Sequence, residues 1–287
     1  MLGRITAGLF FILLLWGNLV AGMKAGMACP DWPLCQGRVL PPLQLDVWME
    51  FTHRILAALA TLCLILLSRQ RLKSYPGFNK AIPIAALGLI TTEIVIGGIV
   101  VLLELPVQLT TLHFMTALTI YLLVLYMTAC DGEGEPVVFS LSGYAGVFFS
   151  LVVLVFSQAS LGAYLRHSAG GLACPDFPTC NGEWIPTVWS WQVLVNYSHR
   201  VVALALFLTA GLVYLVSLLD KRLASWRADC LMLTCLLGLQ IGVGFVVVRS
   251  GLLYSVTALH LAVALAAVWF TLRMWLGSTR QLKDLPE

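Results

Sequence analysis

Apolar residues are grouped along this chain into eight long runs, separated by shorter polar stretches. Each run is close to the roughly 20 residues that a helix needs to cross the hydrocarbon core of a bilayer. None shows the period-2 alternation that is typical of a membrane-spanning strand. The pattern therefore predicts eight transmembrane helices. Their ranges are 5–22, 48–68, 81–103, 107–129, 144–165, 191–219, 229–248 and 254–276.

Composition supports a membrane protein and excludes two other classes. Of the 287 residues, 60% are hydrophobic and only 11% are charged, whereas soluble domains have roughly 45–50% apolar and 25% charged residues. The chain has 17 Lys and Arg and 14 Asp and Glu. Many of the basic residues flank the membrane spans, so too few are left to form a basic surface for nucleic acid. We expect an all-α integral membrane protein, not a soluble enzyme or a nucleic-acid-binding protein.

The second half of the chain repeats the first. The matched segments are 28–37 with 173–182, 50–54 with 196–200, and 111–113 with 258–260. They read ACPDWPLCQG and ACPDFPTCNG, EFTHR and NYSHR, TLH and ALH, and their offset grows only from 145 to 147 residues. Such internal similarity predicts two copies of one structural unit. Because each copy has an even number of spans, both are expected to run the same way through the membrane.

We therefore predict two tandem four-helix bundles related as a parallel repeat. The N-terminal half covers residues 1–130, a cytoplasmic linker covers 131–143 and the C-terminal half covers 144–287. The first apolar run has a counterpart at 153–167, which favours a span over a cleaved signal peptide. If the chain crosses the membrane eight times, most Lys and Arg lie on the same side as the two termini. The positive-inside rule then predicts that the termini are cytoplasmic.

Four of the five histidines lie near the outer ends of the second, fourth, sixth and eighth predicted spans. They are His53, His113, His199 and His260. Ionisable residues inside a membrane are costly and usually functional. Two imidazoles from two facing helices supply the axial ligands of a six-coordinate haem, whereas zinc needs three or four ligands. The pattern favours one bis-histidine haem in each half.

The residues beside the histidines differ between the halves. Arg54 and Arg200 each follow a histidine at the outer mouth, where a guanidinium either pairs with haem propionates or anchors its helix at the membrane surface. Glu50 is matched by Asn196, three residues before the histidine on the same helical face. A carboxylate can exchange a proton where an amide only hydrogen-bonds. This mismatch therefore indicates a division of labour between the halves. Glu50 is either a group that exchanges a proton beside the ligand or a partner of Arg54 or of a loop, and both readings stay open.

A second mismatch lies deeper in the membrane, where Glu93 is matched by Gln240. Glu93 is either a satisfied polar residue of the bundle or a proton-exchanging group, and both readings stay open. Glycines in the same spans either admit a flat ring or let helices pack closely. These glycines are Gly97, Gly98, Gly242 and Gly244.

Two cysteine pairs lie in the repeated outer loops. They are Cys29 with Cys35 and Cys174 with Cys180. The loops face the oxidising side, so disulfides are expected, and two thiols per loop are too few for a closed zinc site. The bridges either staple the loops or form redox-active pairs. The other cysteines are predicted to be packing residues; these are Cys63, Cys130, Cys230 and Cys235.

Taken in order, these motifs resemble the haem A synthase family of cytochrome oxidase assembly proteins. The resemblance covers residues from about 8 to 276. It implies an oxidoreductase that converts the C8 methyl of haem O to the formyl group of haem A, with water as the expected oxygen source. It also implies that His53 and His113 hold haem O as substrate, with Glu50 as the catalytic carboxylate.

The resemblance further implies that His199 and His260 hold a permanent haem b. Arg166, in the LRH sequence that enters the second loop, joins Arg54 and Arg200 as an expected contact of haem propionates. The first half departs from the family here, because it has AGM at 21–23. That departure bears on the propionate contacts of the first haem.

The expected partners are haem O, haem O synthase, an electron acceptor of unknown identity and the lipid bilayer. No nucleic acid is expected, and the sequence is compatible with a homo-oligomer. The expected location is the bacterial cytoplasmic (inner) membrane, crossed several times, with both termini cytoplasmic.

Three other functions compete with this one. A b-type membrane cytochrome for electron transfer would carry ligands near both membrane faces, whereas all four histidines lie towards one face. A thiol–disulfide exchanger would leave the histidines unexplained. A transporter would have broken helices and charged residues at the midplane. The electron-transfer cytochrome is the strongest of these alternatives.

Overall fold

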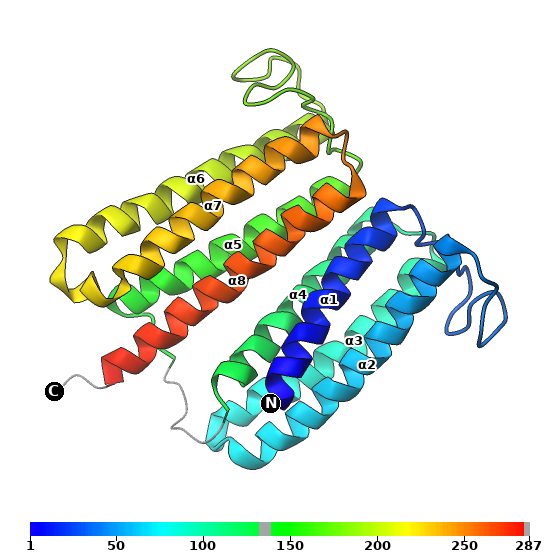
Figure 1. Cartoon of the computed structure of the whole chain (residues 1–287), viewed down its shortest axis with the longest axis horizontal. Coiled ribbons are helices and arrows are strands. Elements are labelled where there is room, and N and C mark those ends of the chain that lie inside the picture. The colour runs from blue at the N-terminus through cyan, green and yellow to red at the C-terminus, as the bar shows by residue number, and fades with distance from the viewer. Residues whose placement is uncertain (132–138, 284–287) are drawn as a thin grey trace. The chain divides into compact units, whose positions relative to one another are not determined.

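The computed structural model describes residues 1–131 and 139–283. Within those residues every regular element is a helix, and eight α-helices are long and apolar enough to cross a membrane (Figure 1). The predicted all-α, eight-span fold is therefore confirmed. The α-helices are α1 Leu2–Gly22, α2 Leu45–Ser74, α3 Ala81–Leu102, α4 Val107–Ala129, α5 Gly143–His167, α6 Trp191–Leu219, α7 Arg227–Arg249 and α8 Tyr254–Lys283. Two 3-10 helices, η1 Gly77–Lys80 and η2 Lys221–Trp226, precede α3 and α7.

Several helices extend past the predicted apolar runs, most clearly α2. The extra turn carries basic residues, which favour a helix but not the hydrocarbon core. One of them, Arg71, is buried and donates from Nε to the backbone carbonyl of Met127 at 2.8 Å. The helix ends at Ser74 because Tyr75 precedes Pro76, and the residue before a proline disfavours the helical conformation.

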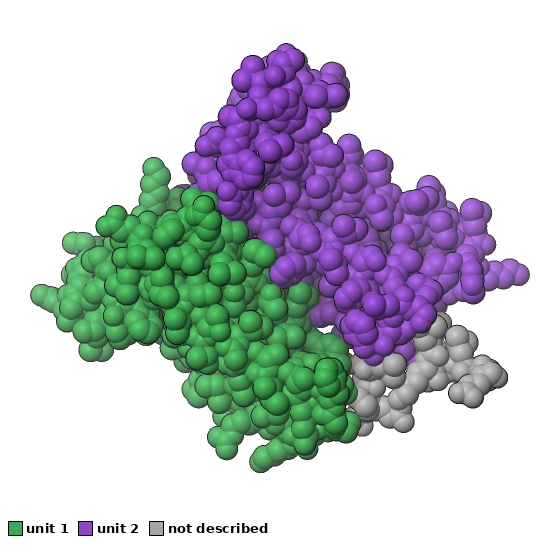
Figure 2. All heavy atoms as spheres, turned by 180° about the vertical axis from the view of Figure 1, so that it is seen from behind, with its two compact units in different colours: residues 1–136 green, residues 137–287 purple. Residues whose placement is uncertain are grey.

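The chain forms two compact units, Met1–Pro136 and Val137–Glu287, which Figure 2 colours separately. In the first unit α1 packs on α2 and α4, and α3 packs on the same two helices, so that α2 and α4 lie diagonally across a closed ring. In the second unit α5 and α7 each pack on α6 and α8, which form the corresponding diagonal pair. Of the predicted linker, residues 132–138 lie outside the described residues. The parallel repeat stays a prediction.

Polar side chains gather inside the bundles, whereas large apolar side chains cover the outside. On α2, Leu59, Leu62 and Leu66 are exposed, while Ala60 and Leu64 are completely buried. An exposed leucine carries no penalty where the surroundings are lipid, whereas an exposed polar group does. The buried polar residues include Glu50, Glu93, Thr111, Thr116, Asn196 and Thr257. The interior near the outer helix ends is therefore the place to look for function.

Both outer loops are closed by the predicted disulfides. Cys29 is bonded to Cys35 and Cys174 to Cys180, with Cα–Cα distances of 4.6 and 4.5 Å. All four bridged cysteines are buried. The first pair packs against Val47 of α2, and the second packs against the matched valine of α6. Each loop is therefore fastened to the first turn of the helix that carries a candidate histidine.

An aspartate inside each disulfide ring holds the loop closed. The Asp31 carboxylate accepts from the backbone N–H of Gln36 at 2.6 Å and of Gly37 at 2.7 Å. The Gly37 amide is the main cause of the lowered pKa of Asp31. Gly37 has φ +69°, a conformation that glycine adopts without strain. In the second loop the Thr179 hydroxyl is the main cause of the lowered pKa of Asp176, about 2, so that this carboxylate stays ionised at any physiological pH.

Thiol alkylation of the intact protein without reductant checks the disulfides. Four of the eight cysteines should react after denaturation and four should not, namely the four that form the two bridges. Under native conditions Cys130 and Cys230 should react slowly, because they are buried. Cys235 is exposed on a membrane-spanning helix, where it would meet lipid, so the packing role predicted for it is wrong. Labelling of Cys29 or Cys174 at full yield would contradict the bridges.

Candidate functional site

The four predicted ligand histidines lie on the diagonal helices of the two units. His53 is on α2 and His113 on α4 of the first unit, and His199 is on α6 and His260 on α8 of the second. The rings keep accessible surface, 28% for the His113 side chain, although neighbouring polar residues are buried. Each unit thus presents two imidazoles towards its own interior.

Each imidazole lies against a glycine of the preceding helix. A Cβ added to the glycine would come within 2.9 to 3.2 Å of the ring in every case, closer than side chains normally pack. The contacts join Gly17 of α1 to His53, Gly97 of α3 to His113, Gly162 of α5 to His199 and Gly244 of α7 to His260. The glycines therefore make room for the imidazoles.

The structure shows what each sequence-predicted glycine faces. Gly97 and Gly244 face histidines, and Gly98 faces the indole of Trp32 in the first disulfide loop. An added Cβ at Gly242 would meet nothing within 4 Å. Sequence reasoning missed Gly17 and Gly162. Their signal was present, because these two glycines are related by the same offset of 145 residues as the disulfide loops.

Each of these glycines shares its helical face with the residue four positions earlier in the chain. We call the glycine and this residue a support pair. The four support pairs are Leu13 with Gly17, Glu93 with Gly97, Gln158 with Gly162, and Gln240 with Gly244.

Three support pairs supply a polar contact to the imidazole. Glu93 Oε1 lies 3.0 Å from His113 Nδ1. The amide nitrogen of Gln240 lies 3.2 Å from His260 Nε2, and that of Gln158 lies 3.1 Å from His199 Nδ1. Glu93 therefore lies beside a candidate ligand, and both readings of its role stay open. Gln158 was missed, although its mismatch with an apolar residue in the first half was readable.

The residues at the Glu50 and Asn196 positions have different partners in the two units. Glu50 is 6% exposed, and its Oε1 accepts from Nε of Arg54 at 3.2 Å. Asn196 is also buried, but its amide donates to the backbone carbonyls of Gly170 and Gly171 at 2.8 and 3.1 Å. An ionised carboxylate cannot donate in this way. The difference between Glu50 and Asn196 therefore changes the hydrogen-bond partners of the side chain as well as its charge.

The two arginines after the histidines bind the disulfide loops. Arg54 donates to the backbone carbonyls of three loop residues at 2.5 to 2.8 Å, and Arg200 does the same in the second loop. The carbonyls belong to Cys29, Asp31 and Leu34 in the first loop and to Cys174, Asp176 and Thr179 in the second. Arg166 lies in the last turn of α5. The contacts of these three arginines with propionates stay predictions.

An aromatic side chain of each loop packs on the helix behind the site, in two different ways. In the first unit the large Trp32 lies on Gly98, with the nearest indole atom 3.1 Å from the added Cβ. In the second unit the smaller Phe177 packs on Phe245, with ring centroids 5.5 Å apart. Arg200 also lies 5.7 Å from the Phe177 ring centroid. In the first unit a large loop residue packs on a glycine, and in the second a smaller loop residue packs on a large one. Both loops therefore stay in contact with the helix behind them.

The donor set fits a haem in each unit. Among the described residues, no three or more His, Cys, Asp or Glu side chains gather into a metal site. Two imidazoles on diagonal helices, each with a glycine behind it, could supply the two axial ligands of a six-coordinate haem. Buried polar atoms at this site have no hydrogen-bond partner within the described residues, and these are Glu93 Oε2, His113 Nδ1, Gln158 Oε1, Gln240 Oε1 and His260 Nδ1.

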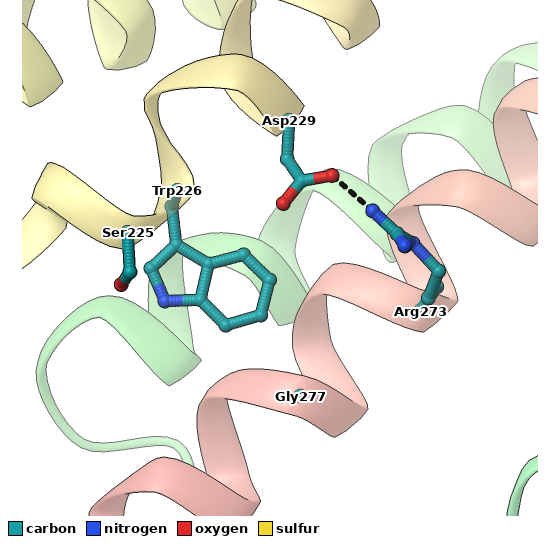
Figure 3. A pocket seen from close by; sticks show the side chains of 5 residues that line it. All are labelled: Ser225, Trp226, Asp229, Arg273 and Gly277. Atoms are coloured by element: carbon teal, nitrogen blue, oxygen red, sulfur yellow. Dashed lines mark hydrogen bonds and ion pairs between the residues drawn. The ribbon is translucent and has the colours of Figure 1, made fainter.

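A separate pocket of about 330 Å³ lies at the other end of the second unit (Figure 3). It is lined by Ser225, Trp226, Asp229, Arg273 and Gly277. An ion pair joins Asp229 to Arg273 across it, and the indole of Trp226 packs on Gly277. Along α8 this pocket is about 25 Å from His260, at 1.5 Å per residue. It is not part of the histidine site.

The chain is similar to known proteins over most of its length. The family of cytochrome oxidase assembly proteins matches residues 2–272. The haem A synthase of Alkalihalophilus pseudofirmus is 31% identical over 228 residues, which cover 76% of each chain. That of Halalkalibacterium halodurans is 30% identical over 72% of each chain. That of Symbiobacterium thermophilum is 29% identical over 76% of this chain and 75% of its own.

Substitution of a support-pair glycine checks the fit to haem. Gly97→Leu should displace the His113 ring, at a cost of about 1–3 kcal/mol for overpacking. The affinity of the first unit for haem should then fall on the order of tenfold to a hundredfold. Gly88→Leu on the same helix is the control, because an added Cβ there meets nothing within 4 Å. Haem-to-protein ratios of the purified variants measure the effect, and equal ratios would contradict it.

Proposed function

Since this chain belongs to the family of cytochrome oxidase assembly proteins, we propose that it is a haem A synthase, which oxidises the C8 methyl group of haem O to the formyl group of haem A. Relatives that carry this name support the proposal over about three quarters of both chains. The strongest support for the proposal comes from the types of residue beside the candidate ligands. Both carboxylates beside the candidate ligands, Glu50 and Glu93, belong to the first unit, and amides stand at the matched positions of the second.

The two units have different tasks in this proposal. His53 and His113 bind haem O as the substrate, and His199 and His260 bind haem b as a resident cofactor. When bound, haem b supplies one-electron transfer. The protein contributes ligation, orientation and local charge. Two amide partners in the second unit suit a site that only has to hold its haem.

The reaction requires one oxygen atom and the removal of four electrons. A methyl group and one water give a formyl group, four protons and four electrons. The first round of oxidation adds water and gives a hydroxymethyl group. The second round gives a gem-diol that loses water to form the aldehyde. The electrons leave to an acceptor outside this chain, and water is the proposed oxygen source.

Glu50 is the proposed catalytic residue. It lies one turn before His53 on α2, so its carboxylate is on the side of the helix that carries the ligand. Arg54 holds Oε1 in place, and the residue is nearly inaccessible to solvent. In such a water-poor site a carboxylate accepts the proton that leaves the methyl carbon, or stabilises the positive charge that develops there. Asn196 can do neither, because its amide is committed to loop carbonyls.

The protein is a multi-pass membrane protein with eight spans of sufficient length and hydropathy. We propose the bacterial inner membrane with both termini cytoplasmic, because basic residues are concentrated on that side. They include Arg4, Arg69, Arg71, Lys73, Lys80, Lys221, Arg222 and Arg227. Haem O synthase as the source of substrate, an electron acceptor and a homo-oligomer remain proposals of the same kind.

Glu50→Gln is the most direct test of the proposed reaction. The substitution keeps the size of the side chain and its ability to accept from Arg54 while removing the charge. Loss of one charge-stabilising contact costs about 3–4 kcal/mol, so haem A formation should fall roughly 10²- to 10³-fold. Haem O or the hydroxymethyl intermediate should accumulate. Chromatography of haems from cells that lack their own enzyme measures this.

The matched control is Asn196→Glu in the second unit, which should add no activity to that unit. Haem A at unaltered levels from Glu50→Gln would remove Glu50 from the mechanism. If Glu50→Gln lost all haem, Glu50 would instead be a residue required for folding.

Replacement of one ligand histidine distinguishes the two proposed haem sites. His260→Ala should abolish binding of haem b while the first unit still loads, because the two ligand pairs belong to different units. The unaltered protein should show the spectrum of low-spin haem with two imidazole ligands. Pyridine haemochrome analysis measures how much haem b each protein retains, and an unchanged haem b content in the variant would show the ligand assignment to be wrong.

A further inference from the structure

After each disulfide ring the loop carries large apolar side chains that the protein leaves uncovered. We call them the loop triads, and they are Val39, Leu40 and Leu43 in the first unit and Trp184, Ile185 and Val188 in the second. All six residues are between 68% and 88% exposed. The two loop triads are related by the same offset of 145 residues as the disulfide rings. Their exposure is therefore a repeated feature of the two units.

Each loop triad belongs to a segment that is fastened to the protein. A buried proline stands between its second and third members, Pro41 in the first loop and Pro186 in the second. In the second loop the Tyr197 hydroxyl also donates to the backbone carbonyl of Trp184 at 3.1 Å. The disulfide ring lies directly before each segment. The exposed side chains on either side of the proline are thus held in place.

We propose that both loop triads insert into the bilayer leaflet next to them, so that lipid covers the exposed side chains. The partner is the interfacial region of a phospholipid bilayer, on the side of the membrane where the candidate ligands lie. The inference goes beyond the proposed function, and it holds whichever reaction the two units catalyse.

The direction of the loops brings the triads over lipid. Membrane-spanning helices are tilted on average by only about 20° from the bilayer normal. In Figure 1 each disulfide loop extends to the side of its own bundle instead of continuing along the helix axes. A segment that leaves a helix end in this direction runs along the membrane surface, beyond the rim of the bundle.

The exposed apolar surface continues from the second loop onto α6. Trp191 and Leu194 are exposed at the start of this helix, and the exposed stripe runs on through Val201, Leu204 and Leu208. These residues follow one another at spacings of three, four and seven residues, which places them along one side of a helix. On a membrane-spanning helix an exposed apolar side contacts lipid. The second loop triad is therefore continuous with a surface that lipid covers.

The residue types of the two segments suit the membrane interface. Neither 39–45 nor 184–191 contains a charged residue. The second segment holds three exposed tryptophans, Trp184, Trp189 and Trp191. Tryptophan is enriched at membrane–water interfaces, because its ring is apolar and its N–H is polar. Trp191 uses that N–H to donate to the Tyr164 hydroxyl at 3.0 Å.

The differences between the loop triads favour lipid over a protein partner. Val39 is matched by the much larger Trp184, and Leu43 by the smaller Val188. The core of a protein interface requires complementary shape, whereas fluid lipid chains adapt to any apolar side chain. Water would leave a contiguous apolar surface exposed, which soluble surfaces largely avoid. The two units keep apolar character at these positions without keeping shape, as a bilayer requires.

Spin labels at the loop triads test the proposal. The full-length, haem-loaded protein is placed in nanodiscs of phosphatidylethanolamine and phosphatidylglycerol, with a single label at Leu40→Cys or at Ile185→Cys. Labelling without reductant keeps both disulfides closed. Collision rates of each label are measured with oxygen, which dissolves in lipid, and with a water-soluble nickel chelate. Alanine replaces the free cysteines in every variant, and these are Cys63, Cys130, Cys230 and Cys235.

Two reference labels calibrate the measurement. Arg222→Cys reports water, because the Arg222 side chain is exposed beyond the end of a span. Leu62→Cys reports lipid, because Leu62 is exposed within the span formed by α2. We expect the ratio of oxygen to nickel collisions at Leu40→Cys and at Ile185→Cys to be severalfold above that of Arg222→Cys and to approach that of Leu62→Cys.

Either of two other results would overturn the proposal. A ratio equal to that of Arg222→Cys would place the triads in water. Low collision rates with both reagents would show that protein covers them, either a partner or a second copy of this chain. If a labelled variant fails to fold, Leu43→Cys and Val188→Cys carry the same test, since these positions are more exposed. No product of the reaction is measured, so the outcome is independent of the proposed function.

Discussion

The close approach of an imidazole to a glycine on the neighbouring helix is the contact on which the rest of this structure depends. It occurs four times, once for each candidate ligand, and a single added carbon would come within 2.9 to 3.2 Å of the ring. Each glycine leaves room for the imidazole of the neighbouring helix, and any larger residue there would displace the ring. The ring of four helices in each unit then brings two imidazoles across one interior.

On this common scaffold the two units differ in a few polar side chains. Carboxylates stand at two positions of the first unit, Glu50 and Glu93, where the second has amides. In a bilayer such groups must find partners inside the protein, and here each does so in its own way. Glu50 pairs with Arg54, and Glu93 with His113. The arginine also binds the disulfide loop, so the loop, the catalytic candidate and the ligand helix form one connected structure.

Much of the architecture could be predicted because it rests on patterns that are local in the chain. Apolar runs predicted the eight spans, and the cysteine spacing together with the oxidising side predicted both bridges. The histidines of the two halves could be matched because they recur at nearly the same offset, 146 and 147 residues. The boundaries were less accurate, as for α2, because helix continues through basic residues that a hydropathy window excludes. The outward-facing Cys235 was also mispredicted, since the side of a helix that meets lipid depends on packing.

The sequence by itself determined the fold class, the number of spans, the disulfides and the set of residue types able to bind haem, because these follow from hydropathy, spacing and internal repetition. Only the tertiary structure decided what each of those residues touches. It placed Glu93 and Gln158 beside histidines and directed Arg54 to loop carbonyls. The physical reason is that these contacts join different helices. Their geometry depends on how closely and at what rotation the helices pack, which no single stretch of sequence specifies.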